Sequence, residues 1–590
     1  MSTLDNINII GLDKNKFHFG ESGHVEYSWS DNIKEQIVQF HFQLTRTDES
    51  NMSYLSRKLS TILETLKTST DSNAKTYLST LYKIIAHTRD IIAGKGEYAL
   101  TYMMIYTWYT YYPILADFAL KCLVNLGNDA EHPYGSWKDI KYFCDYCAKM
   151  SSNKNHPLIK TAIRLTNDKL IKDYKNSINH DTISLLSLAA KWVPREKSKY
   201  SWLYEDLATD YYSEFIATAT TPNSMDKAIK KCKTEYRRVL SELNRKIDTI
   251  QIRQCARVWS TIEFNKVTSI SMVKQKKAFM NLKKDGEIKY PDDIDRVRCF
   301  TNFSNYMQKV VDGKLEVKGK RISMVDFTKQ ALEIISDQET HTSEDAANPD
   351  SSSNIERNML NAQWAINSSQ NDSLGNVIAM VDVSGSMNGD PLCAAIALGI
   401  RISEKSAIGK RVLTFSSSPK WVNLDNCNND FVSRVDLLRR AEWGANTNFY
   451  AALNMILDAI IENKMSPEDV QDMVLVILSD MQMDHGDRCD KKALYTKITE
   501  KYEAAGIRVH GIPYKPPHIL FWNLRSTNGF PTLSNQINTS MMSGFSPVLL
   551  NSFSEHGVTN LQSYTPWSRL EKSLEHERYK IMADKLNSYA

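Results

Sequence analysis

The sequence lacks the features that would assign it to a membrane, to secretion or to a polyelectrolyte class. No apolar run approaches the ~20 residues of a spanning helix, and the nearest, residues 99–120, contains Tyr, Thr, Pro and Asp residues that fit buried helices better. The start, MSTLDNINII, has neither the basic residues nor the apolar core of a signal peptide. The formal charge is only +4 over 590 residues. We therefore expect an intracellular, cytoplasmic protein that does not contact a membrane.

Cysteine is also sparse. The nine cysteines are scattered and odd in number, which fits reduced thiols better than a disulfide framework. Cys144 and Cys147 form one CxxC motif, without a second pair at zinc spacing and without a strand ahead of it. We interpret them as two positions on one face of a helix, and a metal or redox site is the alternative.

A chain of this length favours more than one domain. Up to about residue 335 the apolar residues recur at helical spacing, as they do at Leu55, Leu59, Ile62, Leu63 and Leu66. Successive helices with short polar joints predict an all-α, HEAT-like helical-repeat domain over residues 1–335. Residues 336–354 are polar and acidic, and a short helical pattern follows near 359–366. We assign residues 336–370 to a polar linker with a short helix.

Residues 371–590 show a different pattern, in which continuous apolar strands alternate with helices. The predicted strands are 376–384, 411–416, 473–481, 507–514 and 518–524, and the predicted helices are 391–405, 449–464 and 491–506. This alternation is typical of a parallel sheet covered on both faces, whose ligands bind beyond the carboxyl ends of the strands. We predict an α/β doubly wound, Rossmann-like domain with a C-terminal helical extension.

Oxygen-bearing side chains follow two of these strands. Asp382, Ser384 and Ser386 alternate in the loop after the first strand, Thr447 precedes a helix, and Asp480 ends a later strand. Hard divalent cations prefer such oxygen ligands. The five residues therefore predict a site for Mg²⁺, or for Mn²⁺ or Ca²⁺. The alternative is an Asx or Ser turn that only caps the following helix.

The same five residues resemble the metal-ion-dependent adhesion site of von Willebrand factor A domains, over roughly residues 376–550. The resemblance implies that one coordination position is left to water or to an acidic side chain of a partner protein. Asp484, His485 and Asp487 follow closely, either as an outer shell of the metal or as a solvated acidic loop.

A basic segment lies in the helical region. Residues 227–298 contain 19 Lys and Arg residues against nine Asp and Glu residues. Such a positive face attracts phosphate backbones, and the alternative is a solvated surface or one that docks acidic parts of the same chain. The candidate contacts for nucleic acid or another anion are Lys230, Lys231, Arg237, Arg238, Arg245, Lys246 and Arg253.

The stretch RDIIAGKGEYA contains GKG, but it lacks the glycine spacing, the Ser or Thr and the preceding strand of a phosphate-binding loop. Gly94 and Gly96 fit the end of one helix and the start of the next. Arg89 and Lys95 are the candidates for facing an anion at that helix start.

Several separated motifs resemble an uncharacterised family, that of the domain of unknown function 2828, found in plants, fungi and giant viruses. They include TRDIIAGKGE, HPYGSWKDI, EYRRVLSELNRKIDTIQ, VDVSGSMNGDPLCAAIALG, WGANTNF and VILSDMQMD. The resemblance spans about residues 40–580 and implies a helical part followed by a von Willebrand A domain. The Asn, Lys and Ile content suits an AT-rich genome such as that of a giant virus, for which host cytoplasm or a virion is the expected location.

A more distant similarity is to Ro-type proteins, which join a helical TROVE module to an A domain and bind RNA. From these observations we expect a non-enzymatic binding or scaffold protein that holds an acidic partner group through a divalent cation. The first alternative is Ro-like RNA binding through the helical domain. The second is a metal-dependent hydrolase or transferase, for which His485 and His510 are the nearby histidines.

Overall fold

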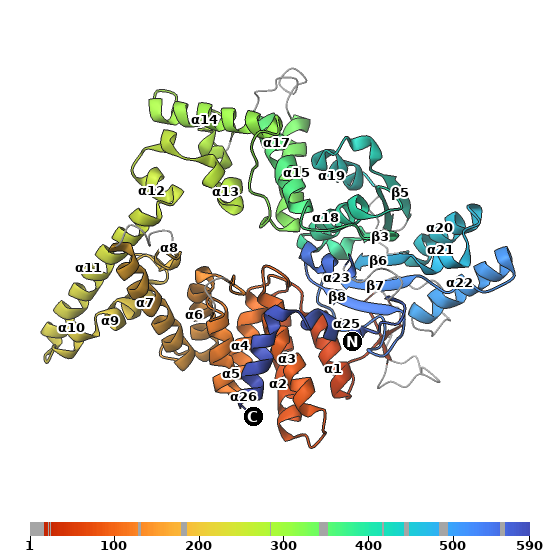
Figure 1. Ribbon diagram of the computed structural model, residues 1–590, viewed down its shortest axis with the longest axis horizontal. Helices are drawn as coiled ribbons and strands as arrows, with labels where there is room; N and C mark the ends of the chain where they lie inside the picture. Colours follow the sequence, from red (N-terminus) through yellow and green to blue (C-terminus); the bar gives the residue numbers. More distant parts are fainter. Residues whose placement is uncertain are drawn as a thin grey trace, which may run out of the picture. The chain divides into compact units, whose positions relative to one another are not determined.

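The computed structural model describes residues 17–21, 23, 25–127, 131–178, 186–283, 285–340, 352–415, 418–441, 448–482, 494–554 and 561–589 (Figure 1). The chain forms two compact units, each made of two segments. Unit 1 contains Met1–Ile84 and Met307–Arg578, and unit 2 contains Ile85–Tyr306 and Tyr579–Ala590. The predicted domains were contiguous segments, whereas both units are discontinuous in sequence.

Unit 1 is built on a six-stranded sheet with the order β5-β4-β3-β6-β7-β8. Neighbouring strands are parallel except for β4 and β5. Every residue of the central strands β3, β6 and β7 is buried, which explains their unbroken apolar sequences. The strands are β3 Val377–Asp382, β4 Arg411–Phe415, β5 Lys420–Asn423, β6 Val474–Ser479, β7 His518–Asn523 and β8 Thr539–Ser543.

Helices cover this sheet, so the predicted α/β architecture is confirmed at this level. Helix α18 packs on β3, β4 and β6, whereas α20 packs on β4 and against α22. Figure 1 shows α18 and α19 on one side of the strands and α20, α21 and α22 on the other. The helices are α18 Asp390–Lys405, α19 Phe431–Arg439, α20 Phe449–Glu462, α21 Pro467–Gln471, α22 Leu494–His510, α23 Asn551–Ser554 and α25 Pro566–Leu574.

Helices on both sides of the predicted linker join unit 1. Helix α15 (Met324–Thr340) packs against α18 and α19, and α17 (Ser352–Ser368) packs against α15 and α19. The Trp364 indole stacks on the Phe431 ring with centroids 4.0 Å apart. The predicted short helix is thus part of the longer α17, and residues 341–351 lie outside the described residues.

The N-terminal segment also belongs to unit 1, which sequence periodicity did not reveal. It forms a short hairpin, β1 (Phe17–Phe19) with β2 (Val25–Tyr27), followed by α1 (Ile33–Gln43), α2 (Glu49–Thr68) and the first part of α3 (Ala74–Arg89). Helix α1 packs on β8 and α25. The Glu35 carboxylate accepts the Ser534 backbone N–H at 2.9 Å, and Gln43 Nε2 donates to the Gly529 carbonyl at 3.2 Å.

Unit 2 consists of helices, as predicted for most of this part of the chain. Cys144 and Cys147 are both fully buried on α6, which confirms their interpretation as positions on one helix face. The elements are α4 Ala99–Tyr111, α5 Pro113–Cys122, α6 Trp137–Ser151, α7 Pro157–Ile178, α8 Ala189–Trp192, α9 Ser201–Tyr211, α10 Ser213–Ala217, α11 Pro222–Ile247, α12 Ile250–Cys255, α13 Ser269–Phe279, the first part of α14 Ile294–Val311, and α26 Lys580–Tyr589. Within the described residues, no helix is long and apolar enough to cross a membrane.

One predicted strand is wrong and four strands were missed. Residues 507–510, predicted to begin a strand, instead continue α22 to His510, and Ile507 on that turn is 57% exposed. A strand at residues 507–510 would need a neighbouring strand to pair with. Both sides of β7 are already occupied, by β6 and β8, so the local β-propensity of this segment is not satisfied. The missed strands β1, β2, β5 and β8 have three to five residues each, too short for an alternating pattern.

Candidate functional site

The two predicted metal-binding aspartates lie at the ends of neighbouring strands. Asp382 is the last residue of β3, and Asp480 directly follows β6. The two strands pair in parallel, with Val381 opposite Leu478. Both aspartates are completely buried. Parallel pairing therefore brings together two carboxylates that are 98 positions apart in sequence.

Asp382 is held by two hydrogen bonds but remains electrostatically strained. Its Oδ1 accepts the Ser384 backbone N–H at 2.9 Å, and its Oδ2 accepts the Ser479 hydroxyl at 2.6 Å. Burial, together with the charge of Asp480, raises the pKa of Asp382 to about 7, and the bonds from Ser384 and Ser479 only partly oppose this shift. The native fold thus keeps a carboxylate where its negative charge is poorly compensated.

The loop after β3 supplies the hydroxyl groups. The Ser384 and Ser386 Oγ atoms lie 3.1 Å apart, with Ser384 buried and Ser386 exposed at a short 3₁₀ turn, Gly385–Met387. The structure thus brings Asp382, Ser384 and Ser386 together as predicted. Thr447, the fifth predicted ligand, lies outside the described residues, as do Asp484, His485 and Asp487.

Among the described residues, Asp480 has a cationic partner and Asp382 has none. Asp480 Oδ1 accepts the Gln482 backbone N–H at 3.1 Å, and its Oδ2 accepts Arg525 Nε at 2.8 Å. Burial disfavours the charge of Arg525, but its ion pairs with Glu21 and Asp480 raise its pKa. Between Asp480 and Gln482, Met481 has a φ of 65°, a left-handed conformation that side chains other than glycine seldom adopt.

The β1–β2 hairpin lies against this edge of the sheet. Arg525 Nη2 donates to Glu21 Oε2 at 2.8 Å, and the Glu21 backbone N–H donates to Gln482 Oε1 at 2.6 Å. Gln482 in turn donates through Nε2 to the buried Glu26 at 2.9 Å. A Cβ atom on Gly529 would lie 1.5 Å from a Glu26 carboxylate oxygen, so only glycine fits there.

The sequence left two alternatives for the Asp-x-Ser-x-Ser loop, a divalent-cation site and a turn that caps the following helix. The turn alternative is real, because Asp382 and Asp480 each accept a backbone N–H two residues ahead. Turns of this kind need one oxygen and do not require two buried carboxylates side by side. Two acids and two hydroxyls at one point are a donor set for a hard cation. No group of three or more His, Cys, Asp or Glu side chains suited to a metal occurs in the described ranges.

Sequence reasoning missed Ser479, Arg525 and Gln482. Ser479 bonds Asp382 because it is the last residue of β6, directly beside the end of β3. Arg525 follows β7 by two residues, in the motif HILFWNLRS, and only the parallel register of β6 and β7 places it beside Asp480. These residues could have been found from the sequence by considering every polar residue at or just beyond the end of a predicted parallel strand, and not the aspartates alone.

The basic residues of α11 and α12 are largely paired within unit 2. Arg237 contacts Glu196 at 2.6 Å, and Arg238 contacts Glu235 at 2.7 Å. Helix α11 buries Cys232, Tyr236, Val239, Leu240 and Leu243, so its cations lie on the outer face. The other candidates are arranged as follows: Lys246 bonds the Ser177 carbonyl, Arg245 contacts the Ser241 hydroxyl, Arg253 pairs with Asp248, Lys231 lies over the Phe215 ring, and Lys230 is exposed.

Arg89 and Lys95 are buried rather than presented to solvent. The Arg89 guanidinium is 1% exposed and donates to Asp139 through Nε at 2.7 Å and Nη2 at 2.8 Å. Lys95 is 3% exposed, and burial lowers its pKa well below the usual value. Their loop joins α3 to α4, as the glycines predicted, and a Cβ atom on Gly94 would lie 2.0 Å from the His87 carbonyl oxygen. An external anion therefore does not reach either cation in this structure.

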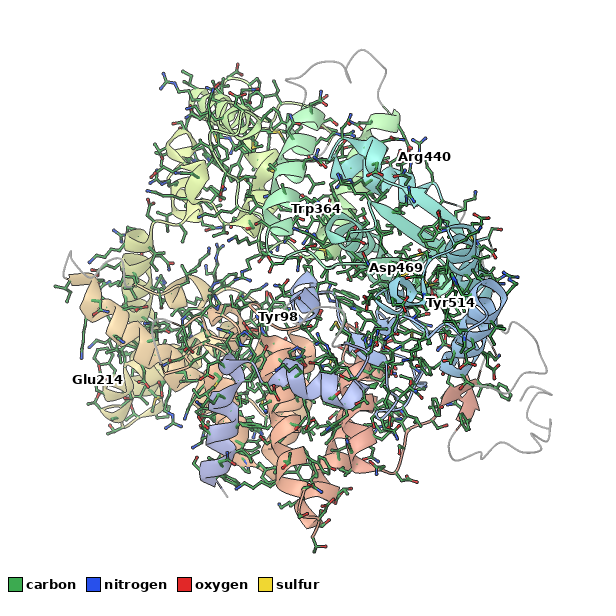
Figure 2. The ribbon with its side chains drawn as sticks, turned by 45° about the vertical axis from the view of Figure 1, so that its right-hand side comes forward. Tyr98, Glu214, Trp364, Arg440, Asp469 and Tyr514 are labelled. Carbon is green, nitrogen blue, oxygen red and sulfur yellow. The ribbon has the colours of Figure 1, made fainter. Side chains whose placement is uncertain are left out.

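A cavity of about 530 Å³ opens at the opposite, amino-terminal edge of the sheet. It is lined mainly by apolar residues of β3 and α20, with Trp421 and Met465 also contributing. Asp469, labelled in Figure 2, lies at this cavity and is exposed. His510 is near this end as well, with Nε2 2.9 Å from the Met465 carbonyl oxygen. The buried charge of the sheet is therefore at the carboxyl edge and not at this cavity.

Comparison with known proteins gives two consecutive matches. Residues 144–368 match a family model described as Domain of unknown function (DUF2828), the predicted family but over a shorter span than the predicted 40–580. Residues 376–588 match a separate model, Domain of unknown function (DUF7788). The Uncharacterized protein L728 of Acanthamoeba polyphaga mimivirus is 30% identical over 515 residues, covering 84% of this chain and 78% of the relative. The junction of the two matches falls between α17 and β3. The chain thus belongs to the same family as this mimivirus protein and combines a DUF2828 region with a following DUF7788 region.

Proposed function

We propose that the chain is a non-enzymatic binding protein whose sheet edge, formed by Asp382, Ser384, Ser386 and Asp480, holds a divalent cation that clamps an acidic group of a partner. In this proposal the DUF7788 region is a von Willebrand A-like domain. Mg²⁺ is the expected ion, with Mn²⁺ and Ca²⁺ as the other oxygen-preferring candidates. Thr447, outside the described residues, completes the proposed ligand set.

The observation that carries the proposal is the poorly compensated charge of Asp382. Its pKa is raised to about 7 by burial and by the neighbouring Asp480. Strongly perturbed carboxyl groups gathered at one position are typical of functional sites. A divalent cation would compensate both carboxylates, and the hydroxyls of Ser384 and Ser386 are uncharged donors, so the complex would be neutral and would keep an open coordination position. A carboxylate of a partner can bind the cation at that open position.

The chemistry that the cation would supply is electrostatic attraction of a partner acid. The residues of this chain would orient it: Ser479 and the Ser384 backbone fix the Asp382 carboxylate, while Gln482 fixes Asp480. The exposed position of Ser386 leaves the site open on the solvent side.

The test is thermal unfolding of the full chain with and without millimolar Mg²⁺. A ligand that binds only the native state stabilises it by about 2.7 kcal/mol at a hundredfold excess over Kd. We expect a higher midpoint for the wild type and no gain for Asp382→Ala. Asp372→Ala, which removes an exposed carboxylate from the same unit, is the matched control and should retain the gain. Equal wild-type midpoints with Mg²⁺, Mn²⁺, Ca²⁺ or chelator would refute the proposal.

A partner is then identified by capture with and without chelator. Immobilised wild type should retain a protein in Mg²⁺ that chelator releases, and Asp382→Ala should retain none. Recovery of the same protein in chelator would show that the partner binds without the cation and would contradict this part of the proposal.

A further inference from the structure

Four lysines gather around aromatic side chains on one surface of unit 2. Lys138 and Lys141 are three residues apart on α6 and therefore share a face of the helix. Lys191 lies on α8, and Lys199 lies just before α9. The four lysines and the rings of Tyr142, Trp192 and Tyr200 define what we call the lysine–aromatic cluster.

The ammonium groups of the cluster lie over shared rings. Three of them surround the Trp192 indole, at 5.8 Å for Lys138, 5.5 Å for Lys141 and 5.8 Å for Lys191. Lys141 and Lys199 share the Tyr200 ring, at 5.4 and 4.8 Å. The negative face of each ring attracts the ammonium group that lies over it. The rings therefore hold like charges close together before any ligand arrives.

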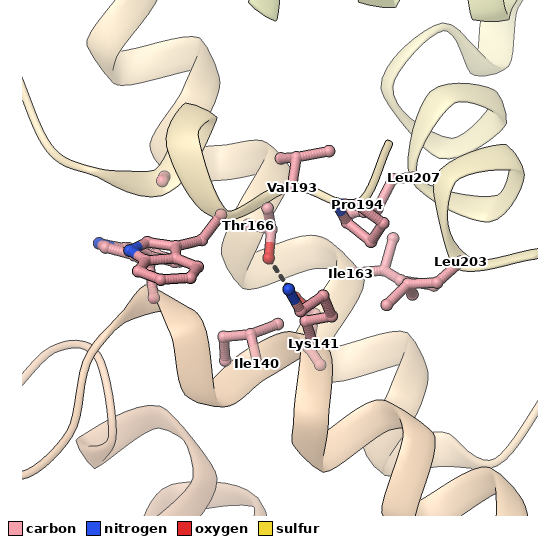
Figure 3. A pocket seen from close by; sticks show the side chains of 12 residues that line it. Ile140, Lys141, Ile163, Thr166, Val193, Pro194, Leu203 and Leu207 are labelled. Atoms are coloured by element: carbon pink, nitrogen blue, oxygen red, sulfur yellow. Dashed lines mark hydrogen bonds between the residues drawn. The ribbon is translucent and has the colours of Figure 1, made fainter. Parts of the chain in front are cut away.

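Two members of the cluster, Lys141 and Trp192, line a narrow apolar crevice (Figure 3). It is formed by α6, α7 and the segment around α8, with a cavity volume of about 10 Å³. Figure 3 shows Lys141 pointing toward Thr166 on one wall of the crevice. The volume is too small for a base or a sugar to enter. A ligand must therefore lie across the surface, against the ammonium groups.

The four lysines of the cluster form no ion pair with a carboxylate within the described residues. The nearby Asp145 is paired with Lys149 at 3.0 Å. A hydrogen bond with Tyr200 and, to a smaller extent, the charge of Asp145 raise the pKa of Lys199. Burial and the charges of Lys138 and Lys199 lower the pKa of Lys141. Helix α11 differs in this respect, because most of its cations already have carboxylate or carbonyl partners.

We propose that the lysine–aromatic cluster binds a compact, multiply phosphorylated small anion. Several adjacent phosphate groups match several converging ammonium groups, because each phosphate oxygen accepts charge-assisted hydrogen bonds. Preorganised cations lose little side-chain entropy when the anion binds. A nucleoside triphosphate, inorganic polyphosphate and an inositol polyphosphate share this chemistry, and the experiment distinguishes them.

Convergence of the cations favours a small anion over a nucleic-acid strand. A strand-binding surface aligns cations along a groove and leaves aromatic faces free for successive bases. Here the cations gather on one indole, and their ammonium groups already occupy positions over the rings. This site is separate from the proposed cation site in unit 1, so either proposal can fail alone.

The test is calorimetric titration of the full chain with inorganic tripolyphosphate, in metal-free buffer at about 150 mM salt. We expect saturable binding that is at least tenfold weaker in the triple variant Lys138→Gln, Lys141→Gln, Lys199→Gln. The matched control, Lys160→Gln, Lys175→Gln, Lys227→Gln, removes the same charge from exposed positions of unit 2 and should bind as the wild type does. ATP and inositol hexakisphosphate form parallel arms, and the tightest ligand identifies the source of the phosphates.

A second measurement does not depend on the heat of binding. Tripolyphosphate should protect Lys138, Lys141 and Lys199 from acetylation by an active ester, and it should leave the exposed Lys160 and Lys227 reactive. Absence of saturable binding, or equal weakening in the control variant, would overturn the proposal. Tighter binding of a single-stranded 12-nucleotide RNA that is insensitive to the cluster substitutions would overturn it as well.

Discussion

Two of the fully buried aspartates, Asp139 in unit 2 and Asp382 in unit 1, have opposite electrostatic surroundings. In unit 2, Asp139 accepts hydrogen bonds from Arg89 Nε at 2.7 Å, Arg89 Nη2 at 2.8 Å, the Tyr102 hydroxyl at 2.8 Å and the Ser136 N–H at 2.8 Å. In unit 1, Asp382 accepts hydrogen bonds from Ser384 and Ser479, has no arginine partner among the described residues and lies near a second carboxylate. Asp139 is compensated by its own fold, whereas Asp382 is not.

The comparison separates a structural from a functional use of buried charge. A carboxylate with a bidentate arginine stabilises one arrangement of helices and leaves nothing for a ligand. Two neighbouring carboxylates cost folding free energy unless a cation joins them. Asp139 therefore fixes the junction of α3, α4 and α6, while Asp382 is available for chemistry.

The largest effect should come from breaking the compensated pair. Asp139→Ala leaves Arg89 as an unpaired buried charge, and we expect a loss of about 3–5 kcal/mol in the free energy of unfolding. Chemical denaturation followed by circular dichroism measures it. Asp145→Ala is the control, because its pair with Lys149 is exposed and contributes at most ~0.5 kcal/mol. Similar losses in both variants would show that Asp139 is not specially compensated.

The next prediction concerns pH, and here the substitution should stabilise the protein instead of destabilising it. Asp382 has a pKa raised from 3.8 to about 7, so between these values the native state holds a proton that the unfolded state has released. Its contribution to stability therefore falls as pH rises through this window. In chelator at pH 8, the free energy of unfolding of Asp382→Asn should exceed that of the wild type by on the order of 2–4 kcal/mol. Chemical denaturation measures this difference, which should vanish below pH 4. A destabilised variant at pH 8 would contradict this prediction.

Arg525 offers a smaller change at the same edge. Its positive charge beside Asp480 opposes a bound cation, so Arg525→Gln should tighten Mn²⁺ binding by ~10-fold, as followed by calorimetry. Arg411→Gln removes an exposed arginine at the opposite edge of the sheet and should leave the affinity unchanged. Weaker binding in Arg525→Gln would mean that the arginine supports the site instead of competing with the ion.

The smallest effect belongs to the hairpin contact. Glu21 is 65% exposed in its ion pair with Arg525, and pairs of this kind contribute ~0.2–1 kcal/mol. Glu21→Gln should therefore lower the denaturation midpoint only slightly, and the difference should shrink in 1 M salt. A loss above ~2 kcal/mol would show that the hairpin depends on this ion pair.

Much of the fold follows from local patterns. The apolar runs at Val377–Asp382, Val474–Ser479 and His518–Asn523 became the central strands, and the stripe from Leu55 to Leu66 became the buried face of α2. The short strands, the extension of α22 and the N-terminal hairpin were not foreseen, because each depends on a neighbour distant in sequence. The same limit applied to the basic residues, whose number was evident but whose partners were not.

By itself the sequence determined the helical and α/β regions, together with Asp382, Ser384, Ser386 and Asp480 as oxygen donors, since hydrophobic period and strand-end position are local properties. Only the tertiary structure decided which charges are compensated. It paired Arg89 with Asp139, placed Arg525 beside Asp480 and left the lysine–aromatic cluster without carboxylate ion pairs among the described residues. The physical reason is that charge compensation depends on distance and burial, and these arise when segments far apart in the chain pack together.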